Sequence, residues 1–136
     1  MAFTGNYSCN TLRTGLLNGT IDFANDTFYL ALYTNTATLN ASTTAYTTTG
    51  EATGGNYVAG GQVVTATVSS DGTTSYVNFS SPSWTGSITA RGALIYKPGD
   101  NGAVCVLDFG SDKTSIVSFN VQMPANTPTS ALLRLV

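Results

Sequence analysis

Short segments in which apolar and polar side chains alternate, separated by turn residues, most constrain the fold of this chain. The first such segment runs from Thr27 to Thr34, with Phe28, Leu30 and Leu32 on one face and tyrosine or alanine on the other. Because aromatic or aliphatic residues occupy both faces, we expect this strand to be covered on both sides.

Two β-hairpins are predicted in the second half of the chain. In each of them, two alternating segments flank a turn rich in Gly, Asp, Asn or Pro, and Asp71-Gly72 in the first turn supplies the positive φ that a tight hairpin demands. Alternation then returns twice before the last residue. The expected strands are residues 62–69 and 74–80 in the first hairpin, 87–97 and 103–109 in the second, and then 117–123 and 131–136.

About seven short strands of this kind, with Gly and Pro at the turns, predict an all-β fold. The expected architecture is an antiparallel β-sandwich that is similar to a jelly roll. Residues 1–136 fit one such domain, since domains commonly contain about 100 to 150 residues.

A short N-terminal helix is also predicted, between Cys9 and Asn18, because apolar residues recur there at helical spacing. Ser8 or Asn10 can cap its start, and Asn18-Gly19 can end it.

Residues 35–61 form the least regular stretch, rich in Thr, Ala, Asn and Gly. A disordered linker and an ordered, meandering loop both fit this composition, and the aromatic residues at intervals favour the ordered loop. Loops longer than about 15 residues are usually functional or mobile, and tyrosine suits surfaces that are half apolar and half wet. We therefore expect a partner-contact surface here. The candidate contact residues are Tyr33, Leu39, Tyr46, Tyr57 and Trp84.

The low charge of the chain limits its possible functions. Only 9% of the residues are charged, against about a quarter in most soluble domains, and histidine is absent. The five basic residues are scattered, which argues against binding to nucleic acid or to an anionic membrane, and the apolar runs are too short to span a bilayer. An uncharged polar surface is cheaper to bury in an assembly than a charged one.

No catalytic or cofactor site is expected. Without histidine, the usual general base, the serine-hydrolase triad and most zinc sites are excluded. Two carboxylate pairs remain, Asp22 with Asp26 and Asp108 with Asp112, and capping of turns is their commoner role. The oxygen-rich turns lack the carboxylate density of a tight calcium site, and no phosphate-binding loop is present. We predict no enzyme activity, no metal and no cofactor.

The cysteines and the opening residues indicate where the chain is made. Cys9 and Cys105 lie far apart in the sequence, so free buried thiols are favoured over a disulfide. The first residues show neither a basic region nor a long apolar region, so we expect no secretory signal. Both features are typical of a chain made in a reducing cytoplasm.

The stretch from Ser81 to Gly92 has a structural interpretation. Trp84 most simply closes the open end of the sandwich, and Arg91 is positioned to pair with Asp108 on the neighbouring strand. The expected buried residues are Leu16, Phe28, Leu30, Leu32, Val64, Val68, Val77, Phe79, Leu94, Ile95, Val104, Val106, Phe119, Val121, Leu133 and Leu135.

Five short blocks along the chain carry a resemblance to a known family. The blocks are Leu30-Ala-Leu-Tyr-Thr-Asn-Thr-Ala-Thr-Leu39, Thr43-Thr-Ala-Tyr-Thr47, Tyr57-Val-Ala-Gly-Gly61, Ile88-Thr-Ala-Arg-Gly-Ala-Leu-Ile-Tyr-Lys97 and Val106-Leu-Asp-Phe-Gly-Ser-Asp-Lys113. Together with the opening segment Cys9 to Asn18, they resemble small virion proteins of tailed bacteriophages, called head decoration, cement or capsid-fibre proteins. The similarity covers almost the whole chain and contains no catalytic signature.

The resemblance implies a β-sandwich on the outside of a shell of major capsid protein, as a dimer or trimer. The chain would be assembled in the bacterial host cytoplasm and end on the capsid surface of the virion. It would reinforce the shell as a cement protein, by its binding free energy alone. The alternative is an adhesin module of a tail or head fibre that binds a host glycan or receptor, which would need an exposed Tyr or Trp patch in residues 35–61.

Overall fold

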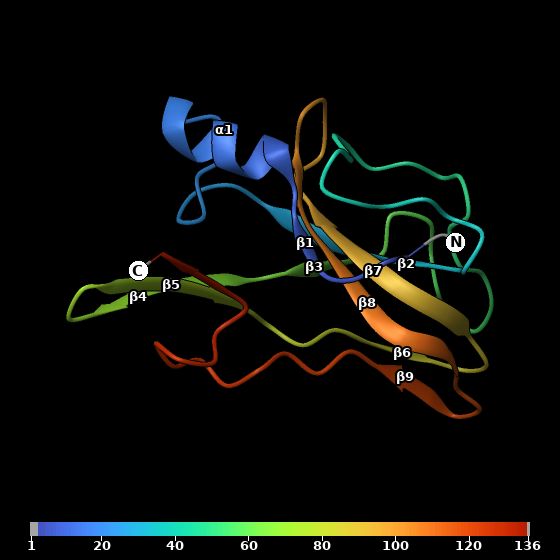
Figure 1. Cartoon of the computed structure of the whole chain (residues 1–136). Helices are drawn as coiled ribbons and strands as arrows, with labels where there is room; N and C mark the ends of the chain where they lie inside the picture. Colours follow the sequence, from blue (N-terminus) through green and yellow to red (C-terminus); the bar gives the residue numbers. More distant parts are fainter. Residues whose placement is uncertain (1–2, 136) are drawn as a thin grey trace.

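The computed structural model describes residues 3–135 as three antiparallel sheets and one helix (Figure 1). A five-stranded sheet has the order β1-β8-β7-β2-β3, a three-stranded sheet the order β10-β5-β4, and β6 pairs with β9. The expected all-β, antiparallel sandwich-like fold with a short N-terminal helix is confirmed. The elements are β1 (Tyr7–Ser8), α1 (Asn10–Asn18), β2 (Phe28–Tyr33), β3 (Gln62–Val64), β4 (Ala66–Asp71), β5 (Thr74–Phe79), β6 (Ser83–Thr85), β7 (Thr89–Tyr96), β8 (Ala103–Thr114), β9 (Ser118–Asn120) and β10 (Leu133–Leu135).

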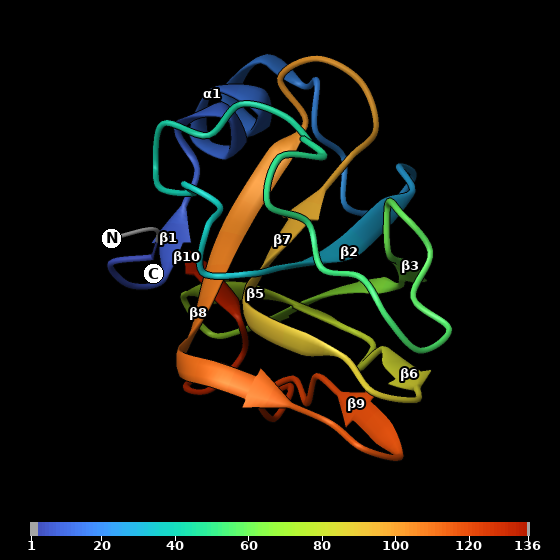
Figure 2. The ribbon, with the colours of Figure 1, turned by 90° about the vertical axis from the view of Figure 1, so that its right-hand side faces the viewer.

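The five-stranded sheet is buried on both faces around β2, as its sequence pattern predicts. Phe28, Leu30 and Leu32 point into an inner core, which fills the space toward the two smaller sheets. Ala31 and Tyr33 point the opposite way, into a loop core under residues 34–61. Figure 2 shows this loop, in teal to green, lying in front of the sheet. The loop is therefore ordered and acts as a covering layer.

Both expected hairpins form. In the first, Asp71 pairs with Thr74 and Gly72 takes a φ of 61°, so the glycine alone supplies the positive φ. In the second, β7 and β8 pair from Thr89 to Tyr96, and β8 continues beyond the expected end at residue 109.

The expected strand 62–69 is in fact two strands in different sheets. Residues Gln62–Val64 pair with β2, whereas Ala66–Asp71 pair with β5. Thr65 separates them, and its carbonyl oxygen accepts a hydrogen bond from the backbone N–H of Ser80 at 2.9 Å. Alternation continues through this break, because a strand that passes from one sheet to the next keeps its apolar face inward.

The last two expected strands are shorter than the pattern suggests. Only Ser118–Asn120 of residues 117–123 is a strand, and Val117 is exposed. The last strand covers Leu133–Leu135, and Val136 lies outside the described residues.

Helix α1 forms where expected, but its start is capped differently. Cys9 is the N-cap residue and makes no side-chain cap hydrogen bond, whereas Ser8 and Asn10 were the expected caps. Gly19 ends the helix with a φ of 80°. A Cβ on Gly15 would lie 2.7 Å from the Ile21 side chain, so this glycine permits close packing of the chain that follows the helix.

The expected core is confirmed for most of its residues and wrong for a group at one end of the molecule. Leu16, Val68 and Leu135 are 37%, 55% and 65% exposed, and Leu133 is only partly buried. All four belong to α1 or to the three-stranded sheet. The sequence pattern places these apolar side chains on an inner face, but no further layer of the described chain covers that face.

Two smaller expectations, an ion pair and the state of the cysteines, are confirmed. Arg91 pairs with Asp108 at 3.0 Å, at a register shift that lies between Ala90 and Gly92. Cys9 and Cys105 are free and buried. Among residues 3–135, no helix combines the length and the apolar character that a membrane span requires.

Candidate functional site

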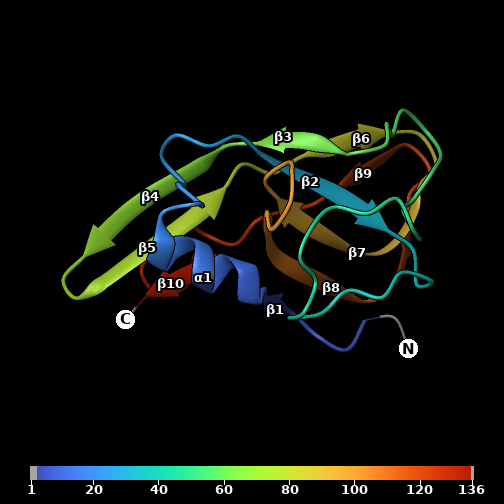
Figure 3. The same cartoon turned by 90° about the horizontal axis from the view of Figure 1, so that it is seen from above.

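An apolar groove of about 490 Å³ lies between α1 and the three-stranded sheet. Figures 1 and 3 both show the helix lying over β5 and β10. The floor of the groove is a row across the sheet, in which Val77 pairs with Leu133 on one side and Val68 on the other. The wall facing this row carries Leu16 of the helix. The groove therefore gathers all four residues that were wrongly expected in the core, namely Leu16, Val68, Leu133 and Leu135.

The charged residues at the groove are both basic. Arg13 and Arg134 line it, and no carboxylate does. Arg13 is held on the helix by hydrogen bonds to the Asn10 Oδ1 atom at 2.7 Å and the Ser8 Oγ atom at 2.9 Å. An apolar floor with a basic rim suits binding of another protein surface, since large exposed apolar patches mark interaction sites.

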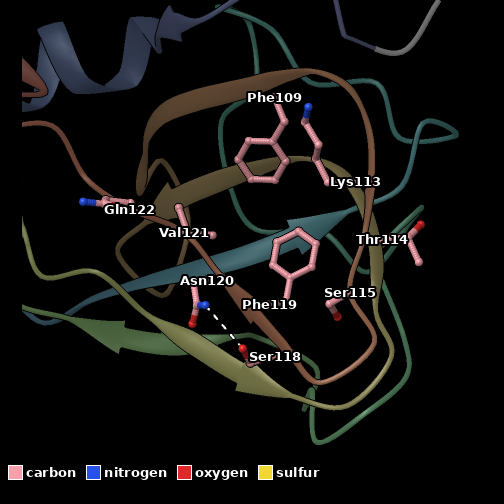
Figure 4. Close-up of a pocket in the computed structure, with 9 residues that line it drawn as sticks. All are labelled: Phe109, Lys113, Thr114, Ser115, Ser118, Phe119, Asn120, Val121 and Gln122. Carbon is pink, nitrogen blue, oxygen red and sulfur yellow. Dashed lines mark hydrogen bonds between the residues drawn. The ribbon is translucent and has the colours of Figure 1, made fainter.

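A second hollow, of about 430 Å³, lies between the distal half of β8 and β9 (Figure 4). The rings of Phe109 and Phe119 form its apolar side, with centroids 6.1 Å apart. Lys113 is its one charged lining residue, and the Asn120 side chain donates a hydrogen bond to Ser118 Oγ at 3.3 Å. A general acid–base pair needs two titratable groups, and this lining does not provide them.

Glu51, the single glutamate of the chain, organises the loop of residues 34–61. Its Oε1 atom accepts a hydrogen bond from the Tyr46 hydroxyl at 2.6 Å, and its Oε2 atom accepts one from the Tyr57 hydroxyl at 2.5 Å and one from the Gly60 N–H at 2.8 Å. One carboxylate thus ties three points of the loop together. Tyr57 also accepts a hydrogen bond from the Leu32 N–H at 3.0 Å, which fixes the loop to β2.

Three tyrosines stack beside this network. The ring of Tyr96 lies 4.9 Å from that of Tyr46 and 5.8 Å from that of Tyr29, with nearly parallel planes. A shallow hollow of about 370 Å³ adjoins them and is also lined by Asp100. The hydroxyls of Tyr46 and Tyr96 are occupied by Glu51 and by the Gly60 carbonyl, so the stack offers ring faces more than hydroxyls.

The five residues expected to contact a partner do not form one surface. Tyr33, Leu39 and Trp84 are at most 2% exposed and pack inside the chain itself. Tyr46 and Tyr57 are half-buried and belong to the Glu51 network. Only these two present part of their side chains to solvent, and their role in partner binding stays a prediction.

Sequence reasoning missed both the groove and the role of Glu51. For Glu51, a usable signal exists: it is the one charged residue between Asp26 and Asp71, and a carboxylate in such a stretch needs donors nearby. For the groove, the pattern shows which side chains face inward but not whether another layer covers them.

Asp22 and Asp26, one of the two carboxylate pairs singled out in the sequence, have hydrogen-bond partners that stabilise the local fold. Asp22 accepts hydrogen bonds from the Asn25 side-chain amide at 2.6 Å and from the Ala24 N–H at 2.9 Å. Asp26 accepts one from the Asp22 N–H at 2.8 Å and pairs with Lys97 at 2.9 Å. These hydrogen bonds hold the pKa values of both carboxyls below their ordinary range. In the described part of the chain, no three His, Cys, Asp or Glu residues gather to hold a metal ion.

The buried tyrosines predict a loss of stability in alkali. Burial raises the pKa of Tyr33 above its ordinary value of 10.0 and raises that of Tyr96 to about 12. The folded state therefore holds these protons more tightly than the unfolded state, so their contribution is complete below about pH 10 and is lost as the pH rises above it. We expect these two tyrosines alone to lower the free energy of unfolding by about 2 kcal/mol between pH 10 and 11.

Urea denaturation at about pH 8, 10 and 11 measures this loss. The control is Tyr96→Phe, which removes one of the titrating groups and is expected to make the decline shallower. A free energy of unfolding that stays constant up to pH 11 would show that the tyrosines do not control alkaline stability.

Comparison with protein-family models, with curated proteins and with solved structures finds no match to this chain. The resemblance to phage decoration proteins therefore stays a hypothesis.

Proposed function

We propose that the protein is a structural component of a tailed-phage particle that binds the outer face of the major capsid protein lattice and reinforces it. The groove between α1 and the three-stranded sheet is the observation that carries this proposal. Its apolar side chains are left in water by the single chain, and covering them would contribute about 25 cal/mol per Å² of apolar area buried.

The low charge of the chain supports the same role. Only 9% of its residues are charged, so little of its surface carries the large desolvation cost of an unpaired buried charge. A cement protein acts by binding alone, and the hydroxyl-rich surface suits permanent contact with neighbours. In this proposal the protein is a homo-oligomer on the virion surface, is assembled in the host cytoplasm, and has no catalytic role, membrane partner or nucleic-acid partner.

The substitution Leu16→Asp tests the groove as the capsid contact. Leu16 is only partly buried, so the variant is expected to fold, but its carboxylate would enter an apolar groove and weaken binding to purified heads at least about tenfold. Co-sedimentation with heads stripped of the protein measures this.

The matched control is Ile116→Asp, which places the same charge on a side chain that is 85% exposed in the turn between β8 and β9. Figure 1 shows this turn at the opposite end of the molecule from α1 and the β4–β5 hairpin, which border the groove. Equal binding by Leu16→Asp and wild type would contradict the groove as the contact, and failure of the wild type to bind heads would contradict the cement role.

The adhesin alternative rests on the stacked tyrosines. Aromatic ring faces beside a carboxylate are a suitable platform for a sugar ring, and Tyr29 and Tyr46 are only half-buried. A glycan array separates the two functions, because specific binding that is lost in Tyr46→Ala supports the adhesin and an array without binding counts against it.

A further inference from the structure

Strand β4 is the longest edge strand among the described residues. The strand orders place β1, β3, β4 and β10 at sheet edges, and the third sheet consists only of β6 and β9. β4 contains six residues, whereas the others contain two or three. Figure 3 shows β4 along the outer side of its hairpin. Its outer side therefore presents a row of free N–H and C=O groups.

The hydrogen bonding of the hairpin tells which backbone groups point outward. The Ser80 N–H donates to the Thr65 carbonyl at 2.9 Å, so Thr65 faces β5. Along an antiparallel strand, every second residue bonds its N–H and C=O groups to one neighbouring strand, and the residues between point theirs to the other side. The backbone groups that face away from β5 are therefore those of Ala66, Val68 and Ser70.

This edge lacks the usual protection against pairing. Natural edge strands are kept short or carry Pro, Lys or a bulge. β4 contains no Pro, Lys or Arg, and its register with β5 runs without a shift from Ala66 to Asp71. Its one charge is Asp71, at the last position. Val68 at the middle is 55% exposed.

We propose that β4 is a homodimer interface, in which it pairs antiparallel with β4 of a second copy about a two-fold axis at Val68. The backbone groups of Val68 point outward in both copies, so the two valines form a hydrogen-bonded pair on the axis. Ala66 then faces Ser70 of the partner subunit, and Thr67 faces Ser69 of the partner subunit.

The strand is complementary to itself in charge and size. In this register, valine meets valine, and the other pairs within residues 66–70 bring together the small side chains of alanine, serine and threonine. Asp71 faces Thr65 of the partner subunit, so the two Asp71 carboxylates lie at opposite ends of the pair and no like charges are opposed. The two three-stranded sheets would form one continuous six-stranded sheet. This interface specifies the homo-oligomer of the proposed function and in that respect rests on it.

Sedimentation equilibrium of the purified full chain tests the interface. At about 100 µM, where a micromolar Kd gives mostly dimer, the expected mass is twice the chain mass of 14.1 kDa. Ser70→Pro removes an outward N–H without touching the β5 ladder and is expected to weaken the dimer at least about tenfold, whereas Ser70→Ala keeps the N–H and the dimer.

A second variant and a second measurement keep the test decisive if Ser70→Pro fails to fold. Val68→Lys places two ammonium groups opposite each other on the axis and is expected to give monomers, while Ser75→Lys, on the adjacent strand, is expected to stay dimeric. Hydrogen exchange of the amides of Ala66, Val68 and Ser70 should slow as the protein concentration rises. A monomeric wild type, or dimers unaffected by Ser70→Pro and Val68→Lys, would overturn the interface. No capsid takes part, so either result leaves capsid binding to its own test.

Discussion

Replacing Phe119 with alanine is expected to lower the free energy of unfolding by about 4 kcal/mol, which is a large part of the stability of a typical domain. Phe119 is 6% exposed and pairs across the strands with Trp84, which is 2% exposed. Its ring also packs against Phe109. It is thus the residue through which β9 closes the inner core, and its truncation would leave a cavity between β6, β9 and β8.

Urea denaturation followed by the fluorescence of Trp84, the single tryptophan, measures this effect. Val117→Ala is the control, because Val117 is 79% exposed at the same turn and its truncation is expected to cost less than about 0.5 kcal/mol. A loss below about 1 kcal/mol for Phe119→Ala would mean that β9 does not close the core.

Replacing Glu51 with alanine is expected to cost about 3 kcal/mol. The substitution removes the acceptor of three hydrogen bonds and leaves the Tyr46 and Tyr57 hydroxyls and the Gly60 N–H without it. Unlike a truncation in the inner core, this substitution is expected to destabilise mainly the loop of residues 34–61, which covers the loop core. Hydrogen exchange is therefore expected to accelerate in that loop more than in β7 and β8.

Two variants sharpen the experiment on Glu51. Glu51→Gln keeps the shape but not the charge of the acceptor and is expected to lose about half as much stability. Thr48→Ala, at an exposed position of the same loop, is expected to change stability by less than about 0.5 kcal/mol. If Glu51→Ala and Thr48→Ala behave alike, the carboxylate does not hold the loop.

The sequence allowed the strands to be predicted where local signals are strong. Alternation around Phe28, Leu30 and Leu32 predicts a strand, and the glycine at position 72 predicts a tight turn, because backbone geometry requires both signals. The structure contains the strand and the turn. The break at Thr65 was not predicted, because alternation is the same on either side of a change of sheet. Strand pairing depends on contacts between residues distant in sequence, which a local pattern does not contain.

The groove and the loop of residues 34–61 also depend on contacts between residues distant in sequence, which the local pattern does not contain. Leu16, Val68 and Leu135 were expected to be buried but are exposed, because the pattern does not show whether another layer covers an apolar face. Conversely, Tyr33 and Leu39 were expected at a contact surface because they border an irregular segment. The segment folds back over the sheet and buries both residues, and the Tyr33 hydroxyl donates a hydrogen bond to the Thr47 carbonyl of this segment at 2.6 Å.

Cryo-electron microscopy of the intact phage particle that carries this chain, with mass spectrometry to confirm its presence, tests the capsid proposal most directly. The account predicts ordered density for the protein on the outer face of the capsid lattice, with the groove between α1 and the three-stranded sheet against the major capsid protein. Density confined to the tail, or absence of the chain from the particle, would contradict it.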